Sequence, residues 1–309
     1  MTKQITNSTR KSNRVDLYQE VTNKMIALLE KGVSPWRCTW NRYGLARNYA
    51  TNHIYSGINA FLMNLTSHPI PYFLSFKQVK AKGGKIKKGA TAERVYFYKS
   101  LFKNKDEDFI KAEEAVALRG MGEEVQVIPM LKYFSVFNVQ DVEGIEIDIP
   151  AVELKEHERI ERCEAVIKGI PNPPEFVFEN ADKAYYSPVL DKLNMPDIKQ
   201  FETAEDYYCT FFHEAVHSTG HQTRLNRKGI TELNSFGSQA YSKEELLAEM
   251  GASFLAAHVG INYDEITENS AAYLQGWLEV LKSDKKLIFK AAAEAQKAVD
   301  YILGVQRNY

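Results

Sequence analysis

Residues 203–220, TAEDYYCTFFHEAVHSTG, carry the clearest structural signal in this chain of 309 residues. Thr203 is a favoured helix N-cap and Gly220 a helix terminator, so the stretch between them predicts one helix. His213 and His217 lie four residues apart, which places both imidazoles on one helical face within reach of a single Zn²⁺. Glu214 projects beside them and can act as general base on a water that the metal activates. The HExxH pattern therefore predicts a hydrolytic metal site, and the alternative is two incidental histidines on a capped helix.

A zinc site that leaves one position open for water needs a third protein ligand. Residues 242–260, SKEELLAEMGASFLAAHVG, predict a partner helix that begins at Ser242 and carries Glu245 and Glu249 on one face. We expect Glu245 to be the third ligand and Glu249 to accept a hydrogen bond from a ligand histidine. The two glutamates could exchange these roles. Ser242-x-x-Glu245 also fits a capping box, in which Glu245 would bind only backbone amides.

Other side chains near these helices are weaker candidates. Thr223 stands where a metzincin would place its third histidine, and His221 follows the helix-ending glycine, so neither is expected to be a ligand. Glu244 is expected on a different face of the second helix. The segment KAYYSP, residues 183–188, is a candidate edge strand that could hold an extended peptide through main-chain hydrogen bonds.

Length and composition define the class of protein. The length favours two domains, and 44% hydrophobic with 26% charged residues is typical of a soluble globular protein. The three cysteines do not form a disulfide framework or a Cys-x-x-Cys pair, which favours a reducing cytoplasm. No apolar run reaches the length of a membrane span, so we expect no membrane association. The pattern of elements predicts an α+β fold.

Charge divides the chain into two halves. Residues 1–142 contain 22 Lys and Arg against 12 Asp and Glu, whereas residues 143–309 contain 17 against 28. A basic half joined to an acidic half indicates a polyanion-binding module beside a second unit. The alternative is an ordinary solvated surface. We expect a disordered basic tail over residues 1–15, a nucleic-acid-binding domain over 16–145 and the metal-site domain over 146–309.

Aromatic rings are interleaved with this basic charge, a combination that suits unpaired bases and phosphates. No zinc finger, homeodomain or RNP motif indicates duplex or base-specific binding, so single-stranded nucleic acid is the expected partner. Phe61, Phe73, Phe76 and Phe97 are expected in the core. The candidate binding residues lie in a turn-rich stretch and in the turn GGKIKKG with its flanks: Trp36, Arg37, Trp40, Arg42, Arg47, Lys82, Lys85, Lys87 and Lys88.

Seven segments together resemble one family, the ArdC-type antirestriction proteins of plasmids, phages and conjugative elements. In the first half these are SPWRCTW, YSGINAFL, YFLSFKQVKAKGGKIKKG and YFSVFNVQDVEG, and in the second AYYSPVLDKLNMPD, FHEAVHSTGHQTRLNR and YSKEELLAEMGASFL. The resemblance runs from about Asp16 to Gly260. It implies an N-terminal single-stranded-DNA-binding domain, which also occurs fused to plasmid primases, and a mostly helical zincin-like metallopeptidase domain with a small sheet.

The resemblance also implies a function and a site. The expected function is protection of incoming DNA from host restriction, with a peptidase site on His213, Glu214, His217 and a glutamate of EELLAE. The Glu-x-x-Ala-Glu spacing is similar to the Glu-x-x-Ala-Asp element of other zincins with a glutamate ligand, which favours Glu245. The expected cofactor is Zn²⁺ or another divalent metal, and the expected substrate is an unidentified host protein. The alternatives are a DNA-binding module with a silent zinc site, and a peptidase that acts on DNA-bound proteins.

Overall fold

The computed structural model describes residues 16–31, 45–66, 68, 70–149, 156–178, 183–232, 239–261 and 270–307. Helices and strands occur together in it, and the expected α+β class is confirmed. The described α-helices are α1 (Leu17–Leu29), α2 (Ile58–Asn64), α3 (Phe76–Ala81), α4 (Ala112–Gly120), α5 (Glu156–Gly169), α6 (Ala204–Ser218), α7 (Lys228–Thr231), α8 (Gln239–Val259), α9 (Ser270–Ser283) and α10 (Leu287–Ile302). The strands are β1 (Arg47–Asn48), β2 (Tyr72–Ser75), β3 (Lys85–Ile86), β4 (Glu93–Lys103), β5 (Phe109–Ile110), β6 (Gln126–Asn138), β7 (Val142–Glu143), β8 (Glu175–Val177), β9 (Tyr185–Ser187) and β10 (Lys192–Asn194). Two short 3₁₀ turns cover Val139–Asp141 and Ile198–Gln200.

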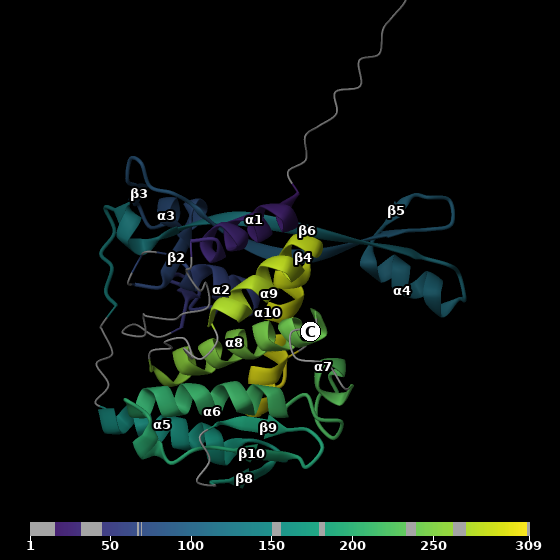
Figure 1. Cartoon of the computed structure of the whole chain (residues 1–309). Coiled ribbons are helices and arrows are strands. Elements are labelled where there is room, and N and C mark those ends of the chain that lie inside the picture. Colours follow the sequence, from purple (N-terminus) through teal and green to yellow (C-terminus); the bar gives the residue numbers. More distant parts are fainter. Residues whose placement is uncertain are drawn as a thin grey trace, which may run out of the picture.

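The first half is built around a five-stranded sheet in the order β1-β2-β6-β4-β5. Only β1 and β2 pair in parallel, and the remaining neighbours are antiparallel. β4 and β6 form a long ribbon, paired from Glu93 with Val136 to Lys103 with Gln126, and the ribbon extends beyond the helices of the body (Figure 1). The charged segment between the two strands, residues 104–125, lies at the tip of the ribbon and forms β5 and α4.

The second half is mainly helical. α6 and α8 pack against each other, α10 packs against α8, and the small sheet β8-β10-β9 lies on the other side of α6 (Figure 1). α1 packs on α9, and α2 packs on α10, so helices from the basic half contribute to the same apolar core as α6 and α8. Thr22 Oγ1 donates to the carbonyl oxygen of Lys285 at 2.9 Å, and Gly57 N donates to Gln296 Oε1 at 3.0 Å. These bonds fix the two halves to one another.

Two local features differ from the sequence expectations. β10 lies between β8 and β9, but its sequence KLN is too short and polar to show a strand pattern. α8 begins at Gln239 rather than at Ser242, so the alternative in which Ser242 and Glu245 form a capping box is wrong. Among the described helices, none combines the length and apolar character needed to cross a membrane.

Candidate metal centre

α6 forms where the sequence predicts it. Thr203 caps the helix through its own hydroxyl, which accepts from Asp206 N at 3.1 Å, and the Asp206 carboxylate accepts from Thr203 N at 3.0 Å. This reciprocal capping box satisfies two backbone donors at the helix start. Phe211, Phe212 and Val216 are buried in the core, which fixes the rotation of the helix about its axis. As a result, the two histidines of α6 face α8.

A glycine allows α6 and α8 to approach closely at this point. A Cβ atom on Gly251 would lie 2.8 Å from Val216 Cγ2, closer than side-chain contacts normally occur. Ala252 and Ala256 follow on α8 and are fully buried. The close contact brings the glutamates of α8 within reach of the imidazoles of α6.

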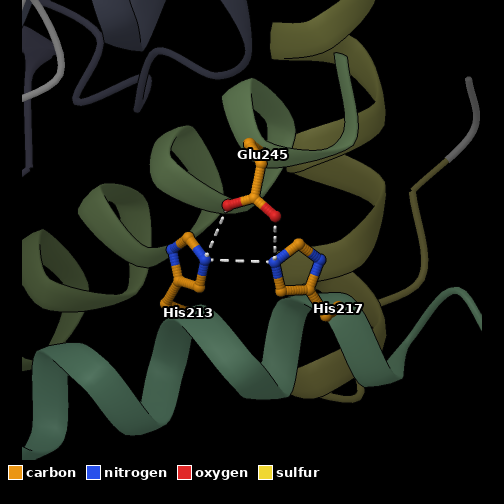
Figure 2. Close-up of side chains that lie close together, drawn as sticks. All are labelled: His213, His217 and Glu245. Atoms are coloured by element: carbon orange, nitrogen blue, oxygen red, sulfur yellow. Dashed lines mark hydrogen bonds and ion pairs between the residues drawn. The ribbon is translucent and has the colours of Figure 1, made fainter. Parts of the chain in front are cut away.

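His213, His217 and Glu245 converge between the two helices (Figure 2). The Nε2 atoms of the histidines are 3.0 Å apart. Glu245 Oε2 lies 3.4 Å from His213 Nε2, and Glu245 Oε1 lies 3.5 Å from His217 Nε2. All three side chains are buried. Two ring nitrogens and the two oxygens of one carboxylate, from three buried side chains, therefore face one another.

The dimensions of this cluster suit a divalent ion. Ligand atoms about 2.0 to 2.2 Å from a tetrahedral zinc are roughly 3.3 to 3.6 Å from each other. The three measured separations, 3.0, 3.4 and 3.5 Å, are close to that edge length. Two imidazoles and one carboxylate are also a donor set that zinc binds well. The residues present therefore fit a metal ion that keeps one position open.

The charges around the cluster also suit a divalent cation. Burial lowers the pKa of His213, but Glu245, Glu249 and Glu214 outweigh it and raise that pKa to about 10. Burial likewise raises the pKa of Glu245, but His217, His213 and a hydrogen bond from Tyr241 lower it below its ordinary value. His213 thus holds a proton among carboxylates, and a cation that binds its imidazole must displace that proton.

The outer nitrogens of the histidines face two further glutamates. Glu249 Oε1 lies 3.7 Å from His213 Nδ1, on the expected side of the ring but beyond the hydrogen bond that the sequence predicts. Glu244 Oε1 lies 3.5 Å from His217 Nδ1, although Glu244 was expected on a face away from the site. Both separations are longer than a hydrogen bond, and both Nδ1 atoms are buried without a hydrogen-bond partner among the described residues.

Arg227 is the residue that sequence reasoning missed. It is buried, it donates to Glu244 Oε1 from Nη2 at 2.6 Å, and it also donates to Val216 O at 2.8 Å and Thr219 Oγ1 at 2.5 Å. Burial raises the pKa of Glu244, but His217 and Arg227 outweigh it and lower that pKa to about 2. Arg227 therefore connects the end of α6 to the glutamate behind His217. Its only sequence signal is an arginine shortly after a helix-ending glycine.

The remaining side chains near the helices take different positions. Glu214 is partly buried, and apart from its electrostatic effect on His213 its carboxylate forms no hydrogen bond or ion pair with another described residue. His221 Nδ1 lies 2.9 Å from Thr223 Oγ1, and His221 is not part of the three-residue cluster. Tyr186 donates to Asp191 at 2.8 Å beside Arg224, while Tyr185 is exposed.

The candidate nucleic-acid residues are only partly described. Trp36, Arg37, Trp40 and Arg42 lie outside the described residues. Arg47 donates to Leu45 O at 3.2 Å and to Asn52 Oδ1 at 3.0 Å, and it stacks over Tyr72. The four lysines of the basic turn are exposed, and within the described chain they pair with no carboxylate; Lys87 donates to Gln140 O, and Lys82 lies over Tyr49. The lysines are Lys82, Lys85, Lys87 and Lys88.

Two family models match the chain in succession. Residues 15–137 match the N-terminal domain of the anti-restriction factor ArdC. Residues 172–294 match a zincin-like metallopeptidase, and this range contains the whole cluster of His213, His217 and Glu245.

Two DNA primases TraC from Escherichia coli each match this chain at 30% identity, and each match covers 94% of this chain. The chain spans only 27% and 20% of the lengths of these primases. The uncharacterized protein y4eC of Sinorhizobium fredii is also 30% identical, and the match covers 95% of this chain and 93% of that protein.

Solved structures extend the similarity to the whole fold. The metal-free crystal structure of the antirestriction protein ArdC from plasmid R388 is 32% identical, covers 94% of this chain and 100% of that chain, and has a TM-score of 0.74. Its Mn(II)-bound structure covers 94% and 97% with a TM-score of 0.71. The two family matches along this chain, together with 32% identity over the full solved chain, show that this protein belongs to the ArdC family of antirestriction proteins.

Proposed function

We propose that this protein protects incoming DNA from host restriction by combining single-stranded DNA binding with metal-dependent peptide hydrolysis. The observation that carries the hydrolytic part is the convergence of His213, His217 and Glu245 from two helices. The proposed roles of the two parts follow their net charges: the basic residues 16–145 bind DNA, and the acidic residues 146–309 contain the peptidase site. We further propose a cytoplasmic location and a host protein as substrate.

The proposed metal is zinc, held by His213 Nε2, His217 Nε2 and the Glu245 carboxylate. The Mn(II)-bound structure of the plasmid R388 protein supports a divalent metal in this family. When bound, such an ion supplies Lewis acidity that acidifies water and polarises a peptide carbonyl. Glu249 and Glu244 orient the two imidazoles from behind.

The protein's own residues supply the remaining steps. Glu214 follows His213 directly on α6, and no described side chain occupies its carboxylate, so it can accept the proton of the attacking water and pass it to the leaving amine. β9 is an edge strand of its sheet and packs against α6. A substrate segment paired with β9 through its main chain would be oriented without regard to its side chains.

The proposed DNA binding predicts a strong dependence on salt. Single-strand affinity is expected to fall with a slope of about −0.7 in log K against log salt for each phosphate contacted. Replacing Lys82, Lys85 and Lys88 by alanine removes three cations and should make the slope shallower by about 2. Fluorescence anisotropy with a labelled oligonucleotide between 50 and 200 mM salt measures this.

A charge-matched control is available on the other half of the chain. Lys168, Lys199 and Lys228 are exposed, and replacing them by alanine should leave the slope unchanged. A wild-type affinity that does not respond to salt, or that shows no preference for single strands over duplex, would contradict the DNA-binding proposal.

A further inference from the structure

The basic half contains an open groove at the edge of its main sheet. The groove has a volume of about 680 Å³ and lies between the turn after β1, the start of α3 and the end of β6. His53 and Tyr55 line one side, Phe76 and Lys77 a second, and Phe134 a third. The groove is separate from the metal site, because none of its lining residues belongs to α6 or α8.

Phenylalanine rings at this groove are exposed instead of buried. Phe76 is 60% exposed and Phe134 is 45% exposed. Phe97, on the neighbouring strand, is 40% exposed, and its ring centroid lies 5.9 Å from that of Phe134. The expectation that Phe76 and Phe97 belong to the core is wrong, whereas Phe61 and Phe73 are buried as expected. The three exposed rings form an apolar platform that the fold leaves open to solvent.

Hydrogen bonds within the protein engage four polar side chains of the groove, those of Asn48, Thr51, Ser75 and Gln78. The amides of Asn48 and Gln78 pair with one another, with both N–O distances at 3.1 Å. Gln78 Oε1 also accepts from Ser75 Oγ at 2.9 Å, and Thr51 Oγ1 donates to Asn48 at 3.2 Å. Tyr55 Oη is buried and has no hydrogen-bond partner among the described residues, so it is one group of the lining left for a ligand. Since the other four groups are engaged, a ligand would bind by ring contact more than by edge-specific hydrogen bonds, which suits sequence-tolerant recognition.

The charged side chains in and beside the groove indicate the class of ligand. The residues that line the groove include Lys77 and no aspartate or glutamate. α3 begins in the groove and runs six residues, about 9 Å, to the turn that carries Lys82 and Lys85. Lys132 lies opposite Phe97 in the ribbon. Aromatic rings flanked by cations suit a polymer that combines flat bases with phosphates.

We propose that this groove binds unpaired nucleobases of single-stranded DNA, which stack on Phe76 and Phe134 while Lys77 and the basic turn contact the phosphates. The proposal rests on the single-strand binding proposed above and names its site. A peptide occupant would use the same apolar rings but would not need the flanking cations.

The test compares wild type with Phe76→Ala and Phe134→Ala in the full-length chain. The probe is a labelled oligothymidine, and a second probe of equal length carries abasic sites. Each variant should bind oligothymidine about 5- to 100-fold more weakly than wild type, because one stacking ring is lost. The abasic probe should bind wild type more weakly than oligothymidine does, and the two probes should differ less for the variants. The salt slope should stay unchanged, because the phosphate contacts remain.

Phe178→Ala is the matched control, since Phe178 is 65% exposed and lies in the other half of the chain. It should bind both probes as wild type does. If both groove variants bind oligothymidine as tightly as wild type does, the groove proposal is overturned and DNA binding stands. The same conclusion follows if the variants have a shallower salt dependence but still distinguish the two probes as wild type does. If wild type binds no single-stranded DNA, the proposed function fails and the groove proposal fails with it. Thermal melting of each variant confirms that the fold is intact.

Discussion

Glutamine in place of Glu214 is expected to lower peptide hydrolysis by about 10²- to 10⁴-fold while metal binding is retained. The substitution keeps the size and hydrogen bonding of the side chain but removes its ability to accept a proton. Since Glu214 is not part of the His213, His217 and Glu245 cluster, the donor atoms for the metal remain. Cleavage of a labelled unfolded protein, measured together with metal content, tests the expectation.

Glu202→Gln is the matched control, because Glu202 is exposed and lies just before the start of α6. It should leave both cleavage and metal content unchanged. Transfer of DNA into a restricting host provides the second measurement. If Glu214→Gln retains full cleavage and full protection, Glu214 is not the base, and the peptidase proposal is contradicted. If cleavage is lost and protection persists, antirestriction depends on DNA binding alone.

Arg227→Met is expected to destabilise the protein by about 3–5 kcal/mol, the usual cost of removing one partner from a buried ion pair. The substitution leaves the Glu244 carboxylate buried beside His217 without its cation. The pKa of Glu244 is about 2 in wild type and would rise in the variant. The carboxylate would therefore take up a proton at a higher pH. A lowered carboxyl pKa stabilises the fold fully above the ordinary value of 4.5, and that stability is lost as pH falls toward 2.

Urea unfolding at neutral pH measures the loss, and the double variant Arg227→Met with Glu244→Gln should recover part of it because no buried charge remains unpaired. Lys282→Met is the control: its ion pair with Glu30 is exposed at 3.0 Å, and losing it should cost less than about 1 kcal/mol. An Arg227→Met variant as stable as wild type would show that the buried pair does not fix α8 against the end of α6.

The sequence predicts those parts of the site that depend on local spacing. The capping box at Thr203, the four-residue spacing of the histidines, and the pairing of Glu245 with Glu249 are all periodic or local signals. The structure brings His213, His217 and Glu245 together and places Glu249 behind His213. The ligand roles themselves remain predictions.

Features that depend on tertiary packing were not predictable in this way. Arg227 and Glu244 are 17 residues apart in the sequence and form a buried ion pair in the fold. Nothing in either segment alone indicates that these side chains are buried. Phe76 and Phe97 have the sequence character of core residues, but Phe76 follows the end of β2 at the open groove, and Phe97 lies on a face of β4 that is left exposed. The packing of α1 and α2 on α9 and α10 depends on apolar faces that match only in the folded chain.

The central claim is that one divalent ion is bound between α6 and α8, and anomalous diffraction at the zinc edge from crystals of the full-length chain tests it most directly. The account predicts a single peak about 2.0–2.2 Å from His213 Nε2, His217 Nε2 and a carboxylate oxygen of Glu245, and loss of that peak in His217→Ala. A peak ligated by Glu249 in place of Glu245, a peak elsewhere on the chain, or no peak after zinc loading would contradict it.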